Sequence, residues 1–416
     1  MAESFRIESL SVAEALDRLL SLVPVLTTVE SVPIYEALDR TLARDLASPV
    51  DVPAYTNSAM DGYAFRASDL SANGTISFPV IGTATAGHPY GEPVPVGSAL
   101  HIMTGGLVPT ELDTVIPFER VAEERSGSEV VRIAFPADAV KPRANVRLQG
   151  EELRTGDTAL HAGERLTPAH IGLAASLGFP ELPVRARLRA AVFATGDEVR
   201  EPGTPLSEGE LYNANGHSLC AQLHAWGADV TNLGILPDDP ERMETVLREA
   251  AKTHDLLLTS GGVGAGDKDF TSLVLSRMGA MTHLHVAMRP GKPLTFGTIP
   301  ADGRSVLFLG LPGNPVAALL SVRLFGKAAI DRMTGVAADQ PLLLPAVAAV
   351  DVRSRPGRTE FVRGTVVRRD DRLFFTPYST QSSALLTTLT ACNACAVIEE
   401  TAGTQPAGRL LDVFLL

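Results

Sequence analysis

The second half of the chain alternates apolar stretches with strand-like spacing and amphipathic stretches with helical spacing. The apolar stretches are residues 190–194, 230–236, 255–259 and 306–309, and the helical stretches are about 217–226, 240–252, 270–278 and 315–333. Strands that alternate with helices form a largely parallel sheet between two helical layers. We therefore predict a three-layer α/β unit that begins at about Arg187.

The rest of the chain consists mainly of short apolar runs separated by Gly, Pro and Asn. This pattern over residues 48–147, and again after residue 341, is typical of β-rich structure with many turns. Helices are expected over residues 11–23, where Ser11 and Glu14 form a capping box, and over residues 168–177. The predicted fold class is a multidomain combination of α/β and β structure.

Composition and charge exclude several classes of protein. The net charge of −12 disfavours a protein whose main task is to bind nucleic acid, because a phosphate backbone requires a basic surface. No apolar run reaches the ~18 residues that span a bilayer, so no membrane partner is expected. Three cysteines offer no disulfide framework, and the N-terminus lacks the pattern of a signal peptide. We expect a cytoplasmic protein.

The sharpest local signal is DLLLTSGGVGAGDKDF, residues 255–270, in which an apolar strand enters a glycine-rich loop before a helix. Gly261 and Gly262 allow backbone N–H groups to approach a ligand, and a helix N-terminus favours anions. The loop is neither a Walker A sequence nor a complete GxGxxG, so it indicates no particular nucleotide. We favour a phosphate or other oxyanion over a plain turn. Asp267 and Asp269 could hold a bridging metal or cap the helix.

Two other turns carry polar groups. MRPGKPLTFG presents Arg289 and Lys292 on a rigid turn that suits an oxyanion, although such a turn alone is more often a solvated loop. In FLGLPGNPVAALL, Asn314 and Pro315 mark the start of a helix at the end of an apolar strand. Ligands of open α/β sheets bind beyond such strand ends.

Acidic residues follow two of the predicted strands. Asp197 and Glu198 come after the strand at 190–194, and Asp238 and Asp239 after the strand at 230–236. An Asp-Asp pair before a proline is usually a turn or a cap, but carboxylates after successive strands of one sheet favour a shared site. The single CxxC near the C-terminus lacks a second pair of metal ligands, and we interpret it as packing.

Taken together, these segments resemble one family. SAMDGYA, IMTGG followed by DTVIP, NVRLQGEEL, TGDEV, SGGV followed by GDKDF, RPGKPLTFG and LPGNP occur in the order found in molybdopterin molybdenumtransferases, to which the C-terminal region of gephyrin belongs. The resemblance covers essentially the whole chain. It implies an elongated linking domain (1–50 and 145–182), a β-rich inserted domain (51–144), an α/β molybdopterin-binding domain (183–335) and a C-terminal β-barrel-like domain (340–416).

The resemblance also implies the activity and the partners. The family inserts molybdate into adenylylated molybdopterin with release of AMP, assisted by magnesium, the last common step of molybdenum cofactor biosynthesis. It implies a homodimer, in which the insertion of one subunit faces the α/β domain of the other, and possible contact with the molybdopterin adenylylating enzyme. Molybdate and tungstate are nearly isosteric, and the sequence leaves the choice between them open.

The site residues are carried over from the matching motifs. The resemblance implies catalytic roles for Asp61, Glu198, Asp238, Asp269 and Lys292, with Glu198, Asp238 and Asp269 as the magnesium ligands. It implies that the substrates are bound by Thr104, Gly261, Gly262, Arg289, Pro312, Pro315, Arg358 and Ser383. Arg289 stands where many members have lysine, which exchanges a compact ammonium for a planar fork. The phrase QSSAL has Ser382 in place of a glycine, next to Ser383.

Two other functions are compatible with parts of this sequence. A molybdopterin adenylyltransferase would need only the α/β domain, and the additional β domains argue against it. A non-enzymatic scaffold of the gephyrin type ranks low, because the acidic residues are present and the chain has no second α/β domain. ATP consumption separates the first alternative from molybdate insertion.

Overall fold

The computed structural model describes residues 8–71, 73–237, 239–262, 270–336 and 342–416. The chain forms two compact units. Unit 1 comprises Met1–Ala43, Gly163–Thr167 and Leu182–Leu416, and unit 2 comprises Arg44–Ala162 and Pro168–Glu181. The division into four domains stays a prediction. Within the described ranges, no helix has the length and apolar character needed to cross a membrane.

A seven-stranded sheet forms the centre of unit 1. In spatial order its strands are β1 (Glu8–Leu10), β19 (Ala280–Val286), β21 (Pro293–Ala301), β22 (Arg304–Leu311), β18 (Leu256–Ser260), β14 (Arg189–Thr195) and β17 (Asp229–Leu236). All are parallel except β21, which is antiparallel to both neighbours. The carboxyl ends of β14, β18 and β22 therefore lie at one edge of the sheet, which confirms the predicted, largely parallel arrangement.

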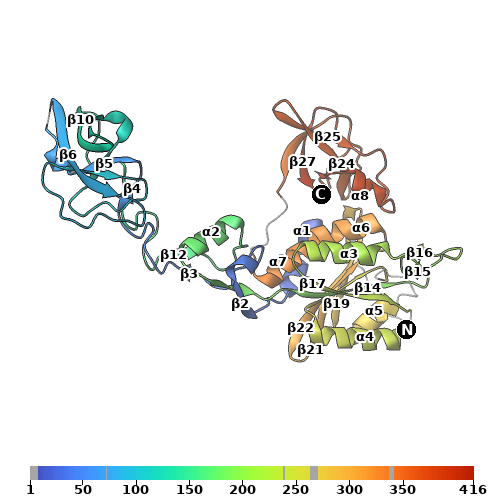
Figure 1. Cartoon of the computed structure of the whole chain (residues 1–416). Coiled ribbons are helices and arrows are strands. Elements are labelled where there is room, and N and C mark those ends of the chain that lie inside the picture. The colour runs from blue at the N-terminus through green and yellow to red at the C-terminus, as the bar shows by residue number, and fades with distance from the viewer. Residues whose placement is uncertain (1–7, 72, 238, 263–269, 337–341) are drawn as a thin grey trace. The chain divides into compact units, whose positions relative to one another are not determined.

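Helices cover both faces of this sheet (Figure 1). One face carries α1 (Val12–Leu22), α3 (Ala214–Ala225), α6 (Pro315–Ser321) and α7 (Lys327–Thr334), and the other carries α4 (Pro240–Thr253) and α5 (Phe270–Met278). A π-helical turn, Val322–Gly326, joins α6 to α7. The predicted helix at 315–333 is therefore present, with this irregular turn inside it. The three-layer α/β architecture is confirmed.

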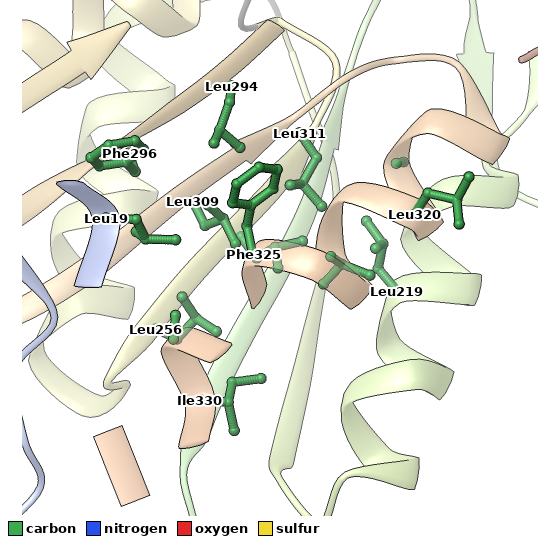
Figure 2. Packing of buried hydrophobic residues seen from close by; sticks show 14 of the residues in the cluster. Leu19, Leu219, Leu256, Leu294, Phe296, Leu309, Leu311, Leu320, Phe325 and Ile330 are labelled. Carbon is green, nitrogen blue, oxygen red and sulfur yellow. The ribbon is translucent and has the colours of Figure 1, made fainter. Parts of the chain in front are cut away.

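Leucine and phenylalanine side chains fill the space between the sheet and its first helical layer. Leu19 of α1, Leu219 of α3 and Phe325 of the π turn belong to one buried cluster with Leu309 and Phe296 of the sheet (Figure 2). All are fully buried, and burying such a side chain contributes about 1.5–3 kcal/mol. This packing fixes the strand ends from which the candidate site is built.

A five-stranded barrel follows the α/β part. Its strands in order are β24 (Thr359–Arg369), β25 (Arg372–Pro377), β23 (Leu344–Ala348), β27 (Leu410–Leu415) and β26 (Ala394–Ile398), and pairing of β24 with β26 closes it. The short helix α8 (Thr387–Ala391) precedes β26. Strand β20 (Met288–Arg289) pairs with β24, and Phe361 and Phe414 on the outer face of the barrel join the core of the α/β part. The predicted C-terminal β-barrel-like domain is confirmed.

Unit 2 is β-rich, as predicted. Its six-stranded sheet contains β8 (Thr114–Pro117), β5 (Gly62–Phe65), β7 (Ala99–Ile102), β6 (Thr75–Ala84), β10 (Glu129–Pro136) and β9 (Ala122–Ser126) in that order. Phe65, Phe78 and Phe135 meet in its core, with ring centroids 5.3–6.0 Å apart. The helix α2 (Pro168–Ser176) forms where a helix was predicted.

Pairs of short strands complete the fold. They are β2 (Val29–Pro33) with β13 (Glu181–Arg185), β3 (Leu46–Ala47) with β12 (Thr158–Leu160), β4 (Asn57–Ser58) with β11 (Val146–Arg147), and β15 (Val199–Arg200) with β16 (Leu211–Tyr212). The last of these pairs follows β14 directly and fixes the backbone beside Glu198, whose carbonyl accepts a hydrogen bond from the N–H of Leu211.

The helix starts follow from capping chemistry. The Ser11 hydroxyl accepts from the Glu14 N–H, and the Glu14 carboxylate accepts from the Ser11 N–H, so the predicted capping box is confirmed. Helix α3 begins at Ala214, earlier than predicted, because the Asn213 side chain accepts from the Gly216 N–H. Asn314 occupies the N-cap position of α6 without a side-chain cap bond.

Candidate functional site

Three of the predicted site segments meet at the carboxyl edge of the sheet in unit 1. Ala194 of β14 lies opposite Ser260 of β18, which lies opposite Leu311 of β22. The segments that continue from these strands contain Glu198, Gly261 and Pro312. The register of the strands therefore brings residues that are far apart in the sequence to one edge, where ligands of α/β sheets bind.

The first residues of the glycine-rich loop have conformations that favour glycine. Gly261 and Gly262 have φ of +92° and +63°, and the Gly261 N–H donates to the Leu311 carbonyl at 3.1 Å. A Cβ on Gly262 would lie 2.5 Å from the Thr271 hydroxyl and 2.6 Å from the Thr195 hydroxyl. Two hydroxyl groups therefore converge on Gly262 in a way that only glycine permits.

Asn215, which was not predicted as a site residue, forms hydrogen bonds across this edge. The Asn215 side-chain amide donates to the Ser260 hydroxyl and to the Gly313 carbonyl, both at 2.7 Å. The Ser260 hydroxyl in turn donates to the Pro312 carbonyl at 2.9 Å. The sequence around Asn215 gives no indication of these bonds, because they join the start of α3, the end of β18 and the loop after β22, which are separate in the sequence.

A cavity of about 880 Å³ opens beside this edge, between the α/β part and the barrel of unit 1. Five of the predicted site residues line it: Arg289, Lys292, Pro312, Arg358 and Ser383. We call it the cationic cavity. Pro315 begins α6 without lining it, and Asn314 and Ala317 on either side do line it. The volume is within the range of small-molecule sites, roughly 300–1,000 Å³.

Positive charge exceeds negative charge in the cationic cavity. Arg289 and Arg358 share one carboxylate, that of Glu360, at N–O distances of 3.7 and 3.3 Å. Glu360 is only 7% exposed, whereas the two arginines are 48% and 41% exposed and can reach a ligand. The pKa of His285 is lowered, first by partial burial and then by the charge of Lys292. Such a field attracts an anion.

The turn that contains Arg289 and Lys292 has a backbone conformation that favours glycine at position 291. Gly291 has φ of +108°, and a Cβ there would lie 2.7 Å from the Ser321 hydroxyl oxygen and 2.9 Å from the terminal carbon of Met288. The Lys292 carbonyl accepts from the Val286 N–H at 2.7 Å. The Arg289–Lys292 turn is therefore packed closely against its surroundings.

The barrel contributes the opposite wall through the turn at residues 380–383. Gln381 anchors this turn, because its side chain accepts from the Arg363 N–H at 3.0 Å and donates to the Arg363 carbonyl at 2.9 Å. The Ser383 carbonyl accepts from the N–H of Val316 in α6 at 3.1 Å. The bond to α6 and the anchoring of Gln381 on the barrel thus hold Ser383 at the cavity.

Unit 2 brings Asp61 and Thr104 into direct contact. One oxygen of the Asp61 carboxylate accepts from both the N–H and the hydroxyl of Thr104, each at 2.7 Å. These two bonds lower the pKa of Asp61, and the nearby His101 adds a smaller effect. Ser58 also exchanges backbone bonds with Gly105 and Gly106. Hydrogen bonds therefore join the two motifs directly.

The expected metal ligands are only partly within the described residues. Asp238 and Asp269 lie outside them, as does Asp267, and Glu198 is an exposed carboxylate after β14. In the described part of the chain no group of three or more His, Cys, Asp or Glu residues is placed to hold a metal. Asp239 caps α4 by accepting from the N–H groups of Glu241 and Arg242. It therefore has the structural role considered for that Asp-Asp pair.

The two cysteines of the CxxC segment are buried. Cys395 is fully buried and belongs to the main core of unit 1, and Cys392 is 9% exposed. Burial raises the pKa of Cys395 to about 12. Packing, as interpreted from the sequence, agrees with this environment.

Three family profiles match successive parts of the chain. The profile "MoeA N-terminal region (domain I and II)" matches residues 10–178, and "Probable molybdopterin binding domain" matches residues 191–332. The profile "MoeA C-terminal region (domain IV)" matches residues 345–416. Together they cover nearly the whole chain, in the order expected from the motifs.

Full-length relatives and solved structures agree with the profiles. The chain is 35% identical over 406 residues to the molybdopterin molybdenumtransferase of Haemophilus influenzae, covering 97% of this chain and 98% of that one. It is 35% identical over 412 residues to that of Synechococcus elongatus, covering 97% and 99%. A molybdopterin biosynthesis MoeA protein from Pyrococcus horikoshii superposes with a TM-score of 0.83 at 25% identity, covering 98% of this chain and 100% of that one.

Proposed function

Because the chain belongs to the molybdopterin molybdenumtransferase family, we propose that it inserts molybdate into adenylylated molybdopterin and releases AMP. It is a transferase of molybdenum cofactor biosynthesis, and its relatives match over nearly their full length. The observation that carries the specific reaction is the cationic cavity. Its arginine and lysine side chains have the charge and the exposure that a tetrahedral oxyanion requires.

In this proposal the cationic cavity binds the oxyanion. Arg289 and Arg358 are each partly neutralised by Glu360, so they are held in place while the cavity keeps a positive balance with Lys292. Guanidinium groups donate in a planar fork that matches paired oxygen atoms. The Ser383 hydroxyl adds a neutral donor on the barrel side.

The edge of the sheet next to this cavity binds the phosphorylated ligand. The strand-to-loop backbone at Gly261 and Gly262 is suited to the close approach of phosphate oxygens, with the buried hydroxyls of Thr195 and Thr271 packed against Gly262. Pro312 lines the cavity, and its carbonyl accepts the bond from Ser260 at the sheet edge. Both ligands would therefore lie close together, and much of the rate would come from proximity.

Magnesium is the cofactor we propose, held by Glu198, Asp238 and Asp269. Carboxylate oxygens are the ligands that Mg²⁺ prefers, and Glu198 lies exposed at the sheet edge, so the donor chemistry fits. When bound, the ion would neutralise phosphate charge and polarise the phosphoryl oxygens.

Asp61 and Thr104 supply a further acidic group. Thr104 keeps the Asp61 carboxylate ionised and fixes its orientation. We propose that it serves the same reaction in a homodimer, where the insertion of one subunit faces the α/β domain of the other. The cytoplasm as compartment, and contact with the adenylylating enzyme, belong to the same proposal.

The test is reconstitution with purified protein, adenylylated molybdopterin, magnesium and molybdate, with AMP and active cofactor followed over time. We expect both products to form without ATP. An adenylyltransferase would instead consume ATP and molybdopterin. The absence of AMP release under these conditions would contradict the proposed reaction and leave family membership intact.

A further inference from the structure

Two exposed methionines flank the bonded pair of Asp61 and Thr104 in unit 2. Met60 directly precedes Asp61, Met103 directly precedes Thr104, and the two methionines are 41% and 36% exposed. Methionine is among the side chains most often fully buried. Four others are buried in the cores of unit 1: Met243, Met278, Met288 and Met333. The position of Met60 and Met103 beside one carboxylate therefore calls for another explanation than core packing.

Two aromatic residues extend this apolar surface. The Phe118 N–H donates to the Asp61 carbonyl, and the Tyr55 hydroxyl donates to the carbonyl of Gly105, next to Thr104, both at 3.4 Å. Phe118 is 45% exposed and Tyr55 is 38% exposed. Exposed apolar residues that gather around one polar group mark a binding surface more often than scattered ones. We call these four exposed residues the methionine patch: Tyr55, Met60, Met103 and Phe118.

The Asp61 carboxylate beside the methionine patch can accept more hydrogen bonds than Thr104 supplies. An ionised carboxylate offers about four acceptor sites and no donor. Both donors of Thr104 reach Oδ1, each at 2.7 Å, while Oδ2 accepts no hydrogen bond from the residues that the structure describes. A ligand at Oδ2 must therefore donate. Molybdate and phosphoryl groups are anionic, and the carboxylate repels them.

One part of the proposed substrate has the chemistry that this surface requires, and it is the pterin ring. A pterin has flat apolar faces, against which thioether and aromatic side chains pack. Its pyrimidinone edge presents the N3–H and the 2-amino group side by side, and two adjacent donors match the open sites of a carboxylate oxygen. Adenine, at the other end of the substrate, has a ring-nitrogen acceptor beside its amino group on each edge. That acceptor would face the carboxylate unfavourably.

We propose that the methionine patch binds the pterin ring of the substrate, with Oδ2 of Asp61 accepting hydrogen bonds from the N3–H and the 2-amino group. Thr104 holds Oδ1 and so leaves Oδ2 for the ligand. The inference rests on the proposed function in taking adenylylated molybdopterin as the substrate. It deepens that function by assigning the pterin end, and not the adenylyl end, to unit 2.

The test titrates the full-length protein with 6-hydroxymethylpterin and follows the methyl signals of its eight methionines by carbon-13 NMR. Met60→Leu and Met103→Leu assign the two signals of the patch. The ring current of a bound pterin should shift both signals at about millimolar ligand, the range expected for a fragment of this size. The signals of the four buried methionines should stay in place. Adenosine should shift neither patch signal, and pteridine-2,4-dione, with oxygen in place of the 2-amino group, should bind at least about tenfold more weakly.

Variants separate the carboxylate from the apolar surface. Asp61→Asn keeps an oxygen for Thr104 but replaces Oδ2 with an amide donor, and it should weaken pterin binding about tenfold or more. Met103→Ala should also weaken binding, and in turnover it should raise the KM for adenylylated molybdopterin while leaving the molybdate KM unchanged. The matched control is Val131→Ala, because Val131 is 38% exposed on β10 of the same unit and lies outside the methionine patch. This control should bind pterin as wild type.

Patch signals that pterin leaves unmoved, or that adenosine or the dione shifts as strongly, would overturn the proposal. So would wild-type pterin affinity in Asp61→Asn. If Asp61→Asn fails to fold, Met103→Ala and the dione decide.

A soluble nitroxide tests whether the patch is open, because it broadens the signals of exposed methyl groups. If the free protein's Met60 and Met103 signals escape broadening, a second copy of the chain covers the patch and the proposal fails. AMP release is measured separately. A protein that releases AMP but binds no pterin at the patch would lose this inference alone, whereas pterin binding without AMP release would contradict only the proposed reaction.

Discussion

At the scale of single residues, the Asp61 carboxylate illustrates how local bonds set chemistry. Two donors of Thr104 reach the same oxygen, and these bonds lower the pKa of Asp61 below its ordinary value of 3.8. A carboxyl group with a lowered folded pKa stabilises the native state above the unfolded pKa. That contribution is lost as the pH falls through the folded pKa.

The first prediction follows from this pair. Thr104→Val removes the hydroxyl donor and keeps the backbone donor, so the pKa of Asp61 should rise part of the way toward its ordinary value. The measurement is the carboxyl carbon chemical shift of Asp61 titrated by NMR in both proteins. An unchanged midpoint would mean that the hydroxyl does not bond the carboxylate in solution.

The second prediction concerns the turn at Gly291. Gly291→Ala should destabilise the protein by about 1–3 kcal/mol from backbone strain, with a further loss from the overlap with Ser321, and should raise the molybdate KM. Gly303→Ala is the matched control, since Gly303 also has a positive φ of +76° but open space around its Cα. Chemical denaturation of the two variants compares them. If both variants lose the same unfolding free energy and the molybdate KM of Gly291→Ala is unchanged, the close packing of the Gly291 turn does not contribute to function.

The motif residues could be predicted from the sequence, but several partners could not. Arg289 and Lys292 were identified because glycine and proline mark a rigid turn around them. Glu360 and Asn215 were missed, since their importance depends on burial and on partners far away in the chain. Ion pairing and burial are tertiary properties that no local pattern encodes.

At the scale of elements, hydrophobic periodicity predicted most strands and helices of the α/β part to within a few residues. It did not predict the reversed strand β21, although Asp302-Gly303, both with positive φ, provides a hairpin signal before β22. Nor did it predict the π turn between α6 and α7. Helical periodicity in the sequence does not distinguish an α turn from a π turn.

The third prediction separates two neighbouring aspartates before α4. Asp239→Ala removes the N-cap of α4 and should cost about 1 kcal/mol in unfolding free energy while magnesium-dependent activity remains. Asp238→Asn should slow AMP release and leave stability unchanged, because Asp238 is a proposed magnesium ligand. Denaturation curves and AMP assays on both variants are the measurements. Full activity of Asp238→Asn at low magnesium would remove that ligand from the proposal.

The fourth prediction concerns Cys395 of β26, which packs into the main core of unit 1. Cys395 is fully buried with a pKa of about 12, so its thiolate is scarce at neutral pH. A thiol reagent such as dithiobis-nitrobenzoate at pH 8 should leave Cys395 unmodified in the native protein and react with all three cysteines after denaturation. Rapid native modification of Cys395, located by mass spectrometry, would contradict the burial described for this strand.

At the scale of the whole molecule, the chain combines a common α/β architecture with β parts of its own family. The family could be predicted from the order of the motifs, and several of those within the described residues lie at strand ends or turns, as at Gly261, Gly262 and Gly291. The association of subunits could not be derived from residue chemistry, and the homodimer is proposed from the resemblance alone.

The fifth prediction tests that dimer through complementation. Asp61→Asn in unit 2 and Arg358→Gln in unit 1 should each be inactive or strongly impaired. If each site is built from unit 1 of one subunit and unit 2 of the other, a mixed dimer has two sites, of which one carries both substitutions and the other carries none. Random co-assembly should then restore about a quarter of wild-type activity. If the mixture is as inactive as the separate variants, Asp61 and Arg358 of the same subunit serve the same site, or no site is shared between subunits.

The most direct measurement of the central claim is the rate of AMP release from adenylylated molybdopterin as a function of molybdate concentration, in wild type and in Arg358→Gln. The account predicts molybdate-dependent release in wild type. In the variant, half-maximal release should require at least about tenfold more molybdate, because one of the cations that bind the oxyanion is lost. AMP release that is independent of molybdate, or an unchanged molybdate requirement in Arg358→Gln, would contradict the assignment of the cationic cavity as the oxyanion site.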